Sequence, residues 1–174
     1  MTMFLKAGAS LRKAIGGLVD LVLNGSVTNP TLPAFLAYNS STDTNQTGAG
    51  TTVTVDFDTE VFDQGGNFAS DTFTAPVTGR YLLSASVFYV EGTTLMVGPN
   101  LTIVTSNRTY TAAPTFAAAS GPPQFTVSLT VLADMDAGDT AIVQFSIGGG
   151  AGDTADIYGA ATNPYTFFSG HLVA

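Results

Sequence analysis

The sequence predicts an all-β protein, an antiparallel sandwich of seven to ten short strands. In most segments after residue 33, apolar residues alternate with polar ones at a period of two. Clusters of Gly, Pro, Asn, Asp and Ser separate these segments, as turns do between strands. The chain has no internal repeat, so a single sandwich domain is expected.

The first 29 residues differ from the rest, and we interpret them as a docking arm (1–29) ahead of a globular domain (30–174). The arm has three basic residues against one acid, a net charge of +2, whereas the remainder has two arginines against twelve acids, or −10. Opposite charges in two segments indicate two roles. Ser10 could cap a short helix, but Gly16–Gly17 costs about 1 kcal/mol per glycine, so an extended conformation fits equally well.

A secretory signal peptide and a membrane span are the competing interpretations of the arm. Its apolar run is short, is interrupted by Asp20 and follows no compact basic region next to Met1. The chain also lacks a run of about 20 apolar residues, so no membrane partner is expected. We therefore favour the docking arm.

The first strands of the domain follow a proline-containing linker. Pro30 and Pro33 stop any helix and favour an extended chain. A short strand is expected over Ala34–Tyr38, then a polar surface loop over Asn39–Gly50. Val53–Asp58 alternates apolar and polar residues and predicts a strand with one buried face.

The central stretch predicts two consecutive half-buried strands around a turn. Phe73 and Ala75 alternate with threonines, and the break at Pro76–Gly79 combines a proline with a glycine expected to accept a positive φ. An apolar row then follows: Tyr81, Leu83, Ala85, Val87 and Tyr89.

The second half continues this pattern. Leu95–Val97 and Leu101–Val104 predict strands with a turn or bulge between them, and the Ala/Pro-rich segment 110–123 is expected to cross an edge. Strands are also predicted over 125–131, 141–147 and 165–173. Asp134–Asp139 is the turn between the first two of these, and 148–164 is expected to be a glycine-rich loop.

Charge is scarce for a soluble domain. Only 10% of the residues are charged, against roughly 25% in typical domains. A solitary domain needs interspersed charge to stay dispersed, so much of this surface is expected to be covered by other copies or another protein. The net charge of −8 argues against a nucleic-acid partner, and the absence of cysteine excludes thiol chemistry.

Five landmarks in sequence order resemble the C1q globular domain. They are PAFLA at 33–37, VTVDFDTEVFDQGGNF at 53–68, F-x-x-P-x-x-G-x-Y at 73–81, AGDTAIVQF at 137–145 and FFSGHLV at 167–173. The resemblance covers about residues 33–174. It implies a ten-stranded jelly roll of the C1q and tumour-necrosis-factor type, usually a homotrimer.

The resemblance also nominates residues for the fold signature and the trimer. These are Phe73, Pro76, Gly79, Tyr81, Gly138, Phe168 and Gly170. The row around Tyr81 and Phe168 is a candidate for the threefold axis, although large aromatic residues more often lie in the core.

No set of residues predicts an enzyme, a cofactor or a metal site. His171 is the only histidine, and no acid or nucleophile has the spacing of a catalytic triad. The Asp134–Asp139 turn suggests calcium but lacks the remaining ligands of an EF-hand loop. Asp56 and Asp58 offer a second, weaker cation site, and Gly148–Gly152 lacks the lysine of a phosphate loop.

The expected function is a non-enzymatic, homotrimeric capsid decoration protein on a bacteriophage virion, assembled in the host cytoplasm. The arm would anchor it to the major capsid protein or another virion protein. The proposed anchoring residues are Phe4, Leu5, Lys6, Leu11, Arg12, Lys13, Ile15, Leu18 and Val19. Two alternatives stay open: a receptor-binding tip of a phage tail fibre or adhesin that recognises host surface glycans through 39–50 and 148–164, and a secreted C1q-like lectin.

Overall fold

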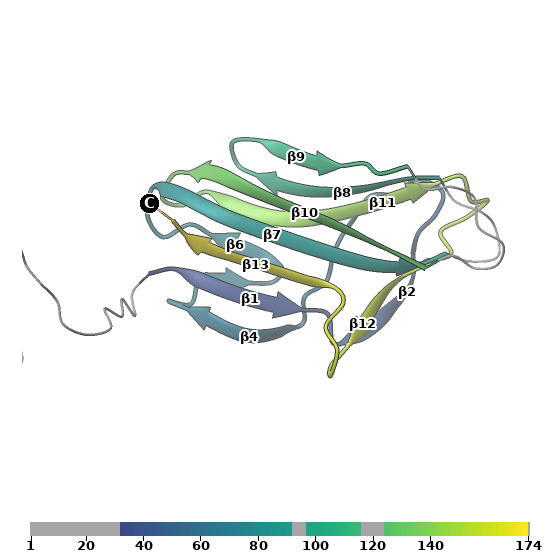
Figure 1. The fold of residues 1–174 in the computed structure, drawn as a ribbon, viewed down its shortest axis with the longest axis horizontal. Coiled ribbons are helices and arrows are strands. Elements are labelled where there is room, and N and C mark those ends of the chain that lie inside the picture. Colours follow the sequence, from purple (N-terminus) through teal and green to yellow (C-terminus); the bar gives the residue numbers. More distant parts are fainter. Residues whose placement is uncertain (1–31, 92–96, 116–123, 174) are drawn as a thin grey trace, which may run out of the picture.

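The computed structural model describes residues 32–91, 97–115 and 124–173, which fold as two antiparallel β-sheets packed face to face (Figure 1). Within these ranges there are thirteen strand segments and no helix. Ten of the segments are four residues or longer, in keeping with the predicted ten-stranded jelly roll. The all-β antiparallel fold is therefore confirmed. No helix in the described ranges is long and apolar enough to cross a membrane.

The strands follow one another along the whole described chain. They are β1 (Ala34–Tyr38), β2 (Ser41–Thr47), β3 (Val53–Thr54), β4 (Thr59–Gln64), β5 (Phe68–Ala69), β6 (Thr72–Thr74), β7 (Gly79–Val90), β8 (Val97–Thr105), β9 (Thr109–Ala112), β10 (Gln124–Met135), β11 (Thr140–Gly148), β12 (Ala155–Ala160) and β13 (Phe167–Leu172).

Strand β7 is the centre of the seven-stranded sheet. The order in this sheet is β2-β12-β7-β13-β1-β4. Strands β12 and β13 pair with successive parts of one edge of β7, and β10 pairs with the other edge along its whole length. The six-stranded sheet has the order β5-β6-β11-β8-β9, with β3 also pairing with β11. The two strands of the central stretch, β6 and β7, therefore lie in different sheets, joined by the turn at 75–78.

The core lies between the two sheets and is built from the predicted alternating rows. The row on β7 from Tyr81 to Tyr89 is fully buried, and so is the facing row from Ala141 to Ile147 on β11. Phe35 links the sheets, with its ring stacked at 4.9 Å on Phe68 and at 4.8 Å on Phe73. The period-two pattern thus marks the buried side chains correctly.

Two predicted loops contain strands, which corrects the sequence analysis. The segment 39–50 holds β2, and 148–164 holds β12; these two strands pair with each other. Most β2 side chains are exposed and polar, so its sequence carries no apolar alternation. Backbone hydrogen bonds to β12 hold β2 in the sheet, and such bonds do not depend on the type of side chain.

The predicted strand at 53–58 is shorter than expected. Only Val53–Thr54 pairs as a strand, although Val55 and Phe57 further on are buried as the pattern requires. The backbone N–H of Phe57 donates to the Asp71 carboxylate at 2.7 Å instead of to a neighbouring strand. A side-chain acceptor has replaced the ladder at this point.

The turn before β7 does not use a positive φ at Gly79, contrary to the prediction. Gly79 is the first residue of β7 and pairs with Met135. The turn is instead held by Tyr81, whose hydroxyl donates to the Val77 carbonyl at 2.7 Å. Gly138, the other signature turn glycine, does have a positive φ of 93°.

The two ends of the sandwich have different contents (Figure 1). The starts of β1 and β7 and the ends of β10 and β13 lie at one end, which we call the arm pole, since the arm would precede β1 there. The end of β7, the start of β10 and β12 lie at the opposite end, the distal pole.

Candidate functional site

The outward side of the seven-stranded sheet, here called the outer face, combines hydrogen-bonded hydroxyl groups with an apolar groove. Cross-strand register places Ser84 opposite both Ser169 and Thr130, and Leu82 opposite both His171 and Leu132. The outer face consists of Leu36, Tyr38, Phe62, Leu82, Ser84, Ser86, Ser128, Thr130, Leu132, Phe167, Ser169 and His171.

Hydroxyl groups in the middle of this face hydrogen-bond to one another. The Ser84 and Thr130 hydroxyls are 2.9 Å apart, and the Ser128 hydroxyl donates to that of Ser86 at 3.1 Å. Because these groups already have partners, covering them costs little desolvation free energy. The centre of the outer face is therefore polar in composition, but its burial in an interface costs little free energy.

An apolar groove adjoins the hydroxyl groups. Its cavity of about 270 Å³ is lined by Leu36, Tyr38, Val61, Pro164 and Phe167. Val61, which lines the groove, is 57% exposed. Leu132, on the other side of the hydroxyl groups, is 51% exposed. Contiguous apolar surface of this kind marks a protein-contact region.

Charged side chains on this sheet lie towards the ends of its strands or on the edge strands β2 and β4, which carry Asp43, Glu60 and Asp63. Arg80 lies opposite Asp134 near the arm pole, and Asp156 lies opposite Val90 at the distal pole. Charged residues are depleted from the centres of protein–protein interfaces, as they are from the centre of this face.

A second cavity, which we call the aromatic pocket, lies at the distal pole. It measures about 260 Å³ and is lined by Phe88, Val90, Gln124, Tyr158 and Tyr165. None of the sequence-based predictions singles out Phe88, Tyr158 or Tyr165. The sequence pattern does indicate that Phe88 points away from the core, because it lies between Val87 and Tyr89, which both belong to the buried row.

The predicted signature residues gather in the core and in two turns. The Phe73 ring lies 5.4 Å from that of Tyr81, and Phe168 meets Phe35 edge-on at 4.9 Å. A Cβ on Gly170 would lie 2.6 Å from the Phe35 ring, so only glycine leaves room for that ring. Pro76 and Gly79 bound the turn before β7, and the Gly138 N–H donates to the Ala75 carbonyl at 2.8 Å.

The suggested threefold-axis role of Tyr81 and Phe168 is wrong. Both side chains are fully buried within a single chain, between the two sheets. They cannot also contact another copy. The residues available for such contact are on the opposite, outward side of the same strands.

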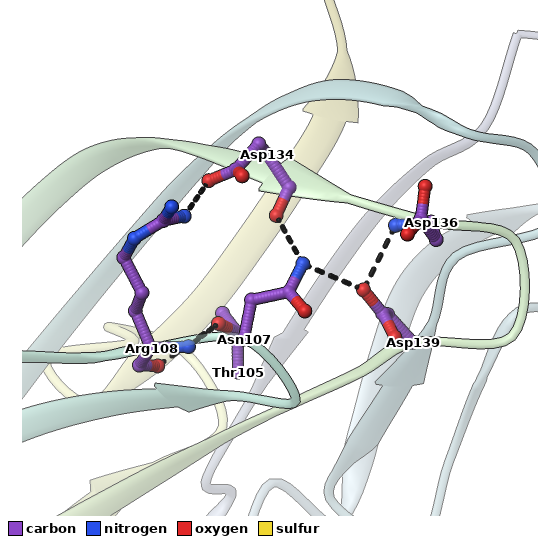
Figure 2. A network of polar contacts seen from close by, with 6 residues as sticks. All are labelled: Thr105, Asn107, Arg108, Asp134, Asp136 and Asp139. Carbon is purple, nitrogen blue, oxygen red and sulfur yellow. Dashed lines mark hydrogen bonds and ion pairs between the residues drawn. The ribbon is translucent and has the colours of Figure 1, made fainter.

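The acidic turn that suggested calcium is a structural network, which Figure 2 shows. The Asp139 carboxylate accepts from the Asp136 N–H at 2.8 Å and from the Asn107 amide at 2.9 Å. Asp134 forms an ion pair with Arg108, and this hydrogen bond lowers the pKa of Asp134. Within the described ranges, no group of three or more His, Cys, Asp or Glu side chains is arranged to hold a metal ion.

In the other acidic pair, Asp56 and Asp58, the structure gives Asp58 a structural role. The Asp58 carboxylate accepts from the Ser40 N–H at 2.9 Å and from its hydroxyl at 2.6 Å. Desolvation raises the pKa of Asp58, but these hydrogen bonds outweigh it and the pKa is lowered. Desolvation, followed by repulsion from Asp71, raises the pKa of Asp56. Asp58 thus fastens the connection after β1.

All nine predicted anchoring residues, from Phe4 to Val19, lie outside the described residues, and so does the predicted boundary at residue 29. The nearest described contact is at the arm pole, where the Leu172 N–H donates to the Pro33 carbonyl at 3.0 Å. This bond holds the residue just before β1 against the end of β13.

A known protein family matches most of the chain. The C1q domain family matches residues 34–173. The chain belongs to the C1q domain family. The match spans the described C1q domain from β1 to the end of β13, and no curated protein is similar enough in sequence to match it.

Solved structures share the fold of this C1q domain at low sequence identity. The globular domain of zebrafish complement 1qA has a TM-score of 0.55 and 19% identity, covering 82% of this chain and 98% of its own. Two structures of murine APRIL, at pH 8.5 and pH 5.0, have TM-scores of 0.53 and 0.54 and identities of 13% and 14%. Each covers 82% of this chain and 99% of its own.

Proposed function

We propose that the protein is a homotrimeric, non-enzymatic binding module whose copies pack through the outer face. The observation that carries this proposal is the outer face itself, with self-bonded hydroxyls at its centre and an apolar groove beside them. Closed cyclic symmetry would bury one such face on each copy. Burial would also explain how a chain with 10% charged residues stays dispersed.

We further propose that the trimer decorates a bacteriophage capsid and is anchored by the arm. Support comes from charge, since an arm of +2 precedes a domain of −10. Apolar arm residues such as Leu11, Ile15 and Leu18 would supply affinity by burial, at roughly 25 cal/mol per Å² before ordering costs. Lys6, Arg12 and Lys13 would steer the arm to an acidic shell.

The position of β1 fits this role. In a sandwich whose first strand begins at the arm pole, a segment preceding β1 is attached at that pole, whereas the aromatic pocket lies at the other. A particle bound through the arm would therefore face the arm pole, and the distal pole would point to solvent.

Deletion of residues 1–29 tests the anchoring. The truncated chain is expected to remain a folded trimer by light scattering but to be lost from purified particles, because folding and assembly depend on the domain and attachment on the arm. A second variant exchanges Lys6, Arg12 and Lys13 for glutamate in the full chain, which should slow attachment while leaving the trimer intact. Normal incorporation of the truncated trimer would refute the anchoring role.

A further inference from the structure

The aromatic pocket has features that neither subunit packing nor arm anchoring requires. Three rings meet in it: those of Phe88 and Tyr158 are perpendicular with centroids 5.3 Å apart, and Tyr165 is 5.3 Å from Phe88. Tyr165 remains 47% exposed although it contacts both other rings. These rings lie outside the core, so packing between the sheets does not explain them.

Three polar groups line the pocket, the hydroxyls of Tyr158 and Tyr165 and the side-chain amide of Gln124. In the part of the chain that the structure describes, the hydroxyls of Tyr158 and Tyr165 and the side-chain amide of Gln124 make no hydrogen bond. Each tyrosine hydroxyl can donate and accept, and the amide offers two donors and an acceptor. The apolar groove contrasts with this, because its one polar group, the Tyr38 hydroxyl, already donates to the Ala161 carbonyl at 3.4 Å.

We infer that the aromatic pocket binds one pyranose ring of a neutral glycan. A pyranose combines a face of C–H groups with a rim of hydroxyls. The C–H face matches the negative face of an aromatic ring, and the rim matches the unengaged hydroxyls and amide. The rings of Phe88 and Tyr158 are perpendicular, so a pyranose ring can stack on one of them while its edge contacts the other.

Size and charge narrow the ligand further. The cavity of about 260 Å³ is smaller than the roughly 300–1,000 Å³ of sites for larger ligands, so it suits a single ring. The domain carries a net charge of −10, and Asp156 lies opposite Val90 at this pole, which disfavours acidic sugars. A neutral hexose or N-acetylhexosamine therefore fits better than a sialic acid.

This inference goes beyond capsid anchoring and does not depend on it. Saturation-transfer NMR and titration with the full chain test it, using the methyl pyranosides of glucose, galactose, mannose and N-acetylglucosamine, and methyl sialoside as the acidic comparator. At least one neutral pyranoside should bind with a dissociation constant on the order of 1 mM, as expected for so small a ligand. Its C–H face should receive saturation from aromatic protons.

Substitutions locate the site. Tyr165→Ala should weaken binding by roughly tenfold, since it removes one aromatic ring and one hydroxyl from the lining of the pocket, and Gln124→Ala should weaken it less. Val77→Ala, which removes an exposed apolar side chain in the turn before β7, is the matched control and should leave binding unchanged. Light scattering on each variant checks assembly.

Three outcomes would overturn the inference: no transfer to any neutral pyranoside, equal binding by Tyr165→Ala, or stronger binding of the sialoside. Dissociation of the Tyr165→Ala oligomer would also overturn it, by assigning the ring to a subunit contact. None of these results bears on the arm, whose loss is read from particle incorporation.

Discussion

Phe35 shows how single residues determine this core. Its ring is stacked between Phe68 and Phe73 from the other sheet and meets Phe168 edge-on. Such contacts contribute about 0.5–1.5 kcal/mol each beyond area burial. The ring fits only because Gly170 on the neighbouring strand lacks a side chain.

Gly170→Ala is therefore expected to destabilise the domain by about 1–3 kcal/mol, the usual cost of overpacking. The added Cβ would lie 2.6 Å from the Phe35 ring and 2.8 Å from a Leu83 methyl group, both in the packed core. The denaturation midpoint in urea measures the loss. Gly152→Ala is the matched control, because nothing lies within 4 Å of its Cβ position; equal midpoints for the two variants would refute this packing role.

At the scale of elements, the Asn107 amide ties two turns together at the arm pole (Figure 2). It donates to the Asp134 carbonyl at 3.1 Å and to the Asp139 carboxylate at 2.9 Å. These bonds join the turn between β8 and β9 to the turn between β10 and β11. The adjacent ion pair of Arg108 and Asp134 is more than half exposed on both sides, so solvent screens it and it contributes little to stability.

Asn107→Ala should lower the free energy of unfolding by about 1 kcal/mol, since it removes two hydrogen bonds, one of them to a charged group. Hydrogen exchange should also speed up in both turns at once. The control is Asn163→Ala, an exposed asparagine for which the structure shows no hydrogen bond, where less than about 0.5 kcal/mol is expected. Exchange confined to the β8–β9 turn would contradict the coupling.

Elements whose side chains alternate were predictable, and elements held by backbone or by polar side chains were not. The rows on β7, β10 and β11 follow directly from period two, because burial on one face imposes it. Strand β2 has no such row, and β12 lies in a segment dominated by glycine. The aromatic pocket escaped prediction because it needs Tyr158 and Tyr165, which meet Phe88 only through the pairing of β12 and β13 with β7.

At the scale of the whole molecule, the proposed trimer depends on the outer face. Leu132 is half exposed on one chain and lies opposite Leu82, next to the bonded hydroxyls. In a trimer packed through this face, a charge at this position would be buried without a partner, which is strongly unfavourable.

The wild-type chain is expected to have three times the mass of one chain, 17.8 kDa, by light scattering. Leu132→Glu should weaken the trimer at least about tenfold and release folded monomers. Val77→Glu places the same charge on an exposed apolar position in the turn before β7 and should leave the mass unchanged. A trimer that persists in Leu132→Glu would show that copies pack elsewhere.

The position of β13 has a consequence for biosynthesis. This strand, the last described in the chain, lies between β7 and β1, both of which leave the ribosome long before it. Until residues 167–172 emerge, the nascent sheet is split, with an open slot flanked by two unpaired strand edges. Such edges can pair with a matching strand of another chain, so we expect neighbouring chains on one polysome to exchange β13 in some copies and form interlocked dimers or trimers.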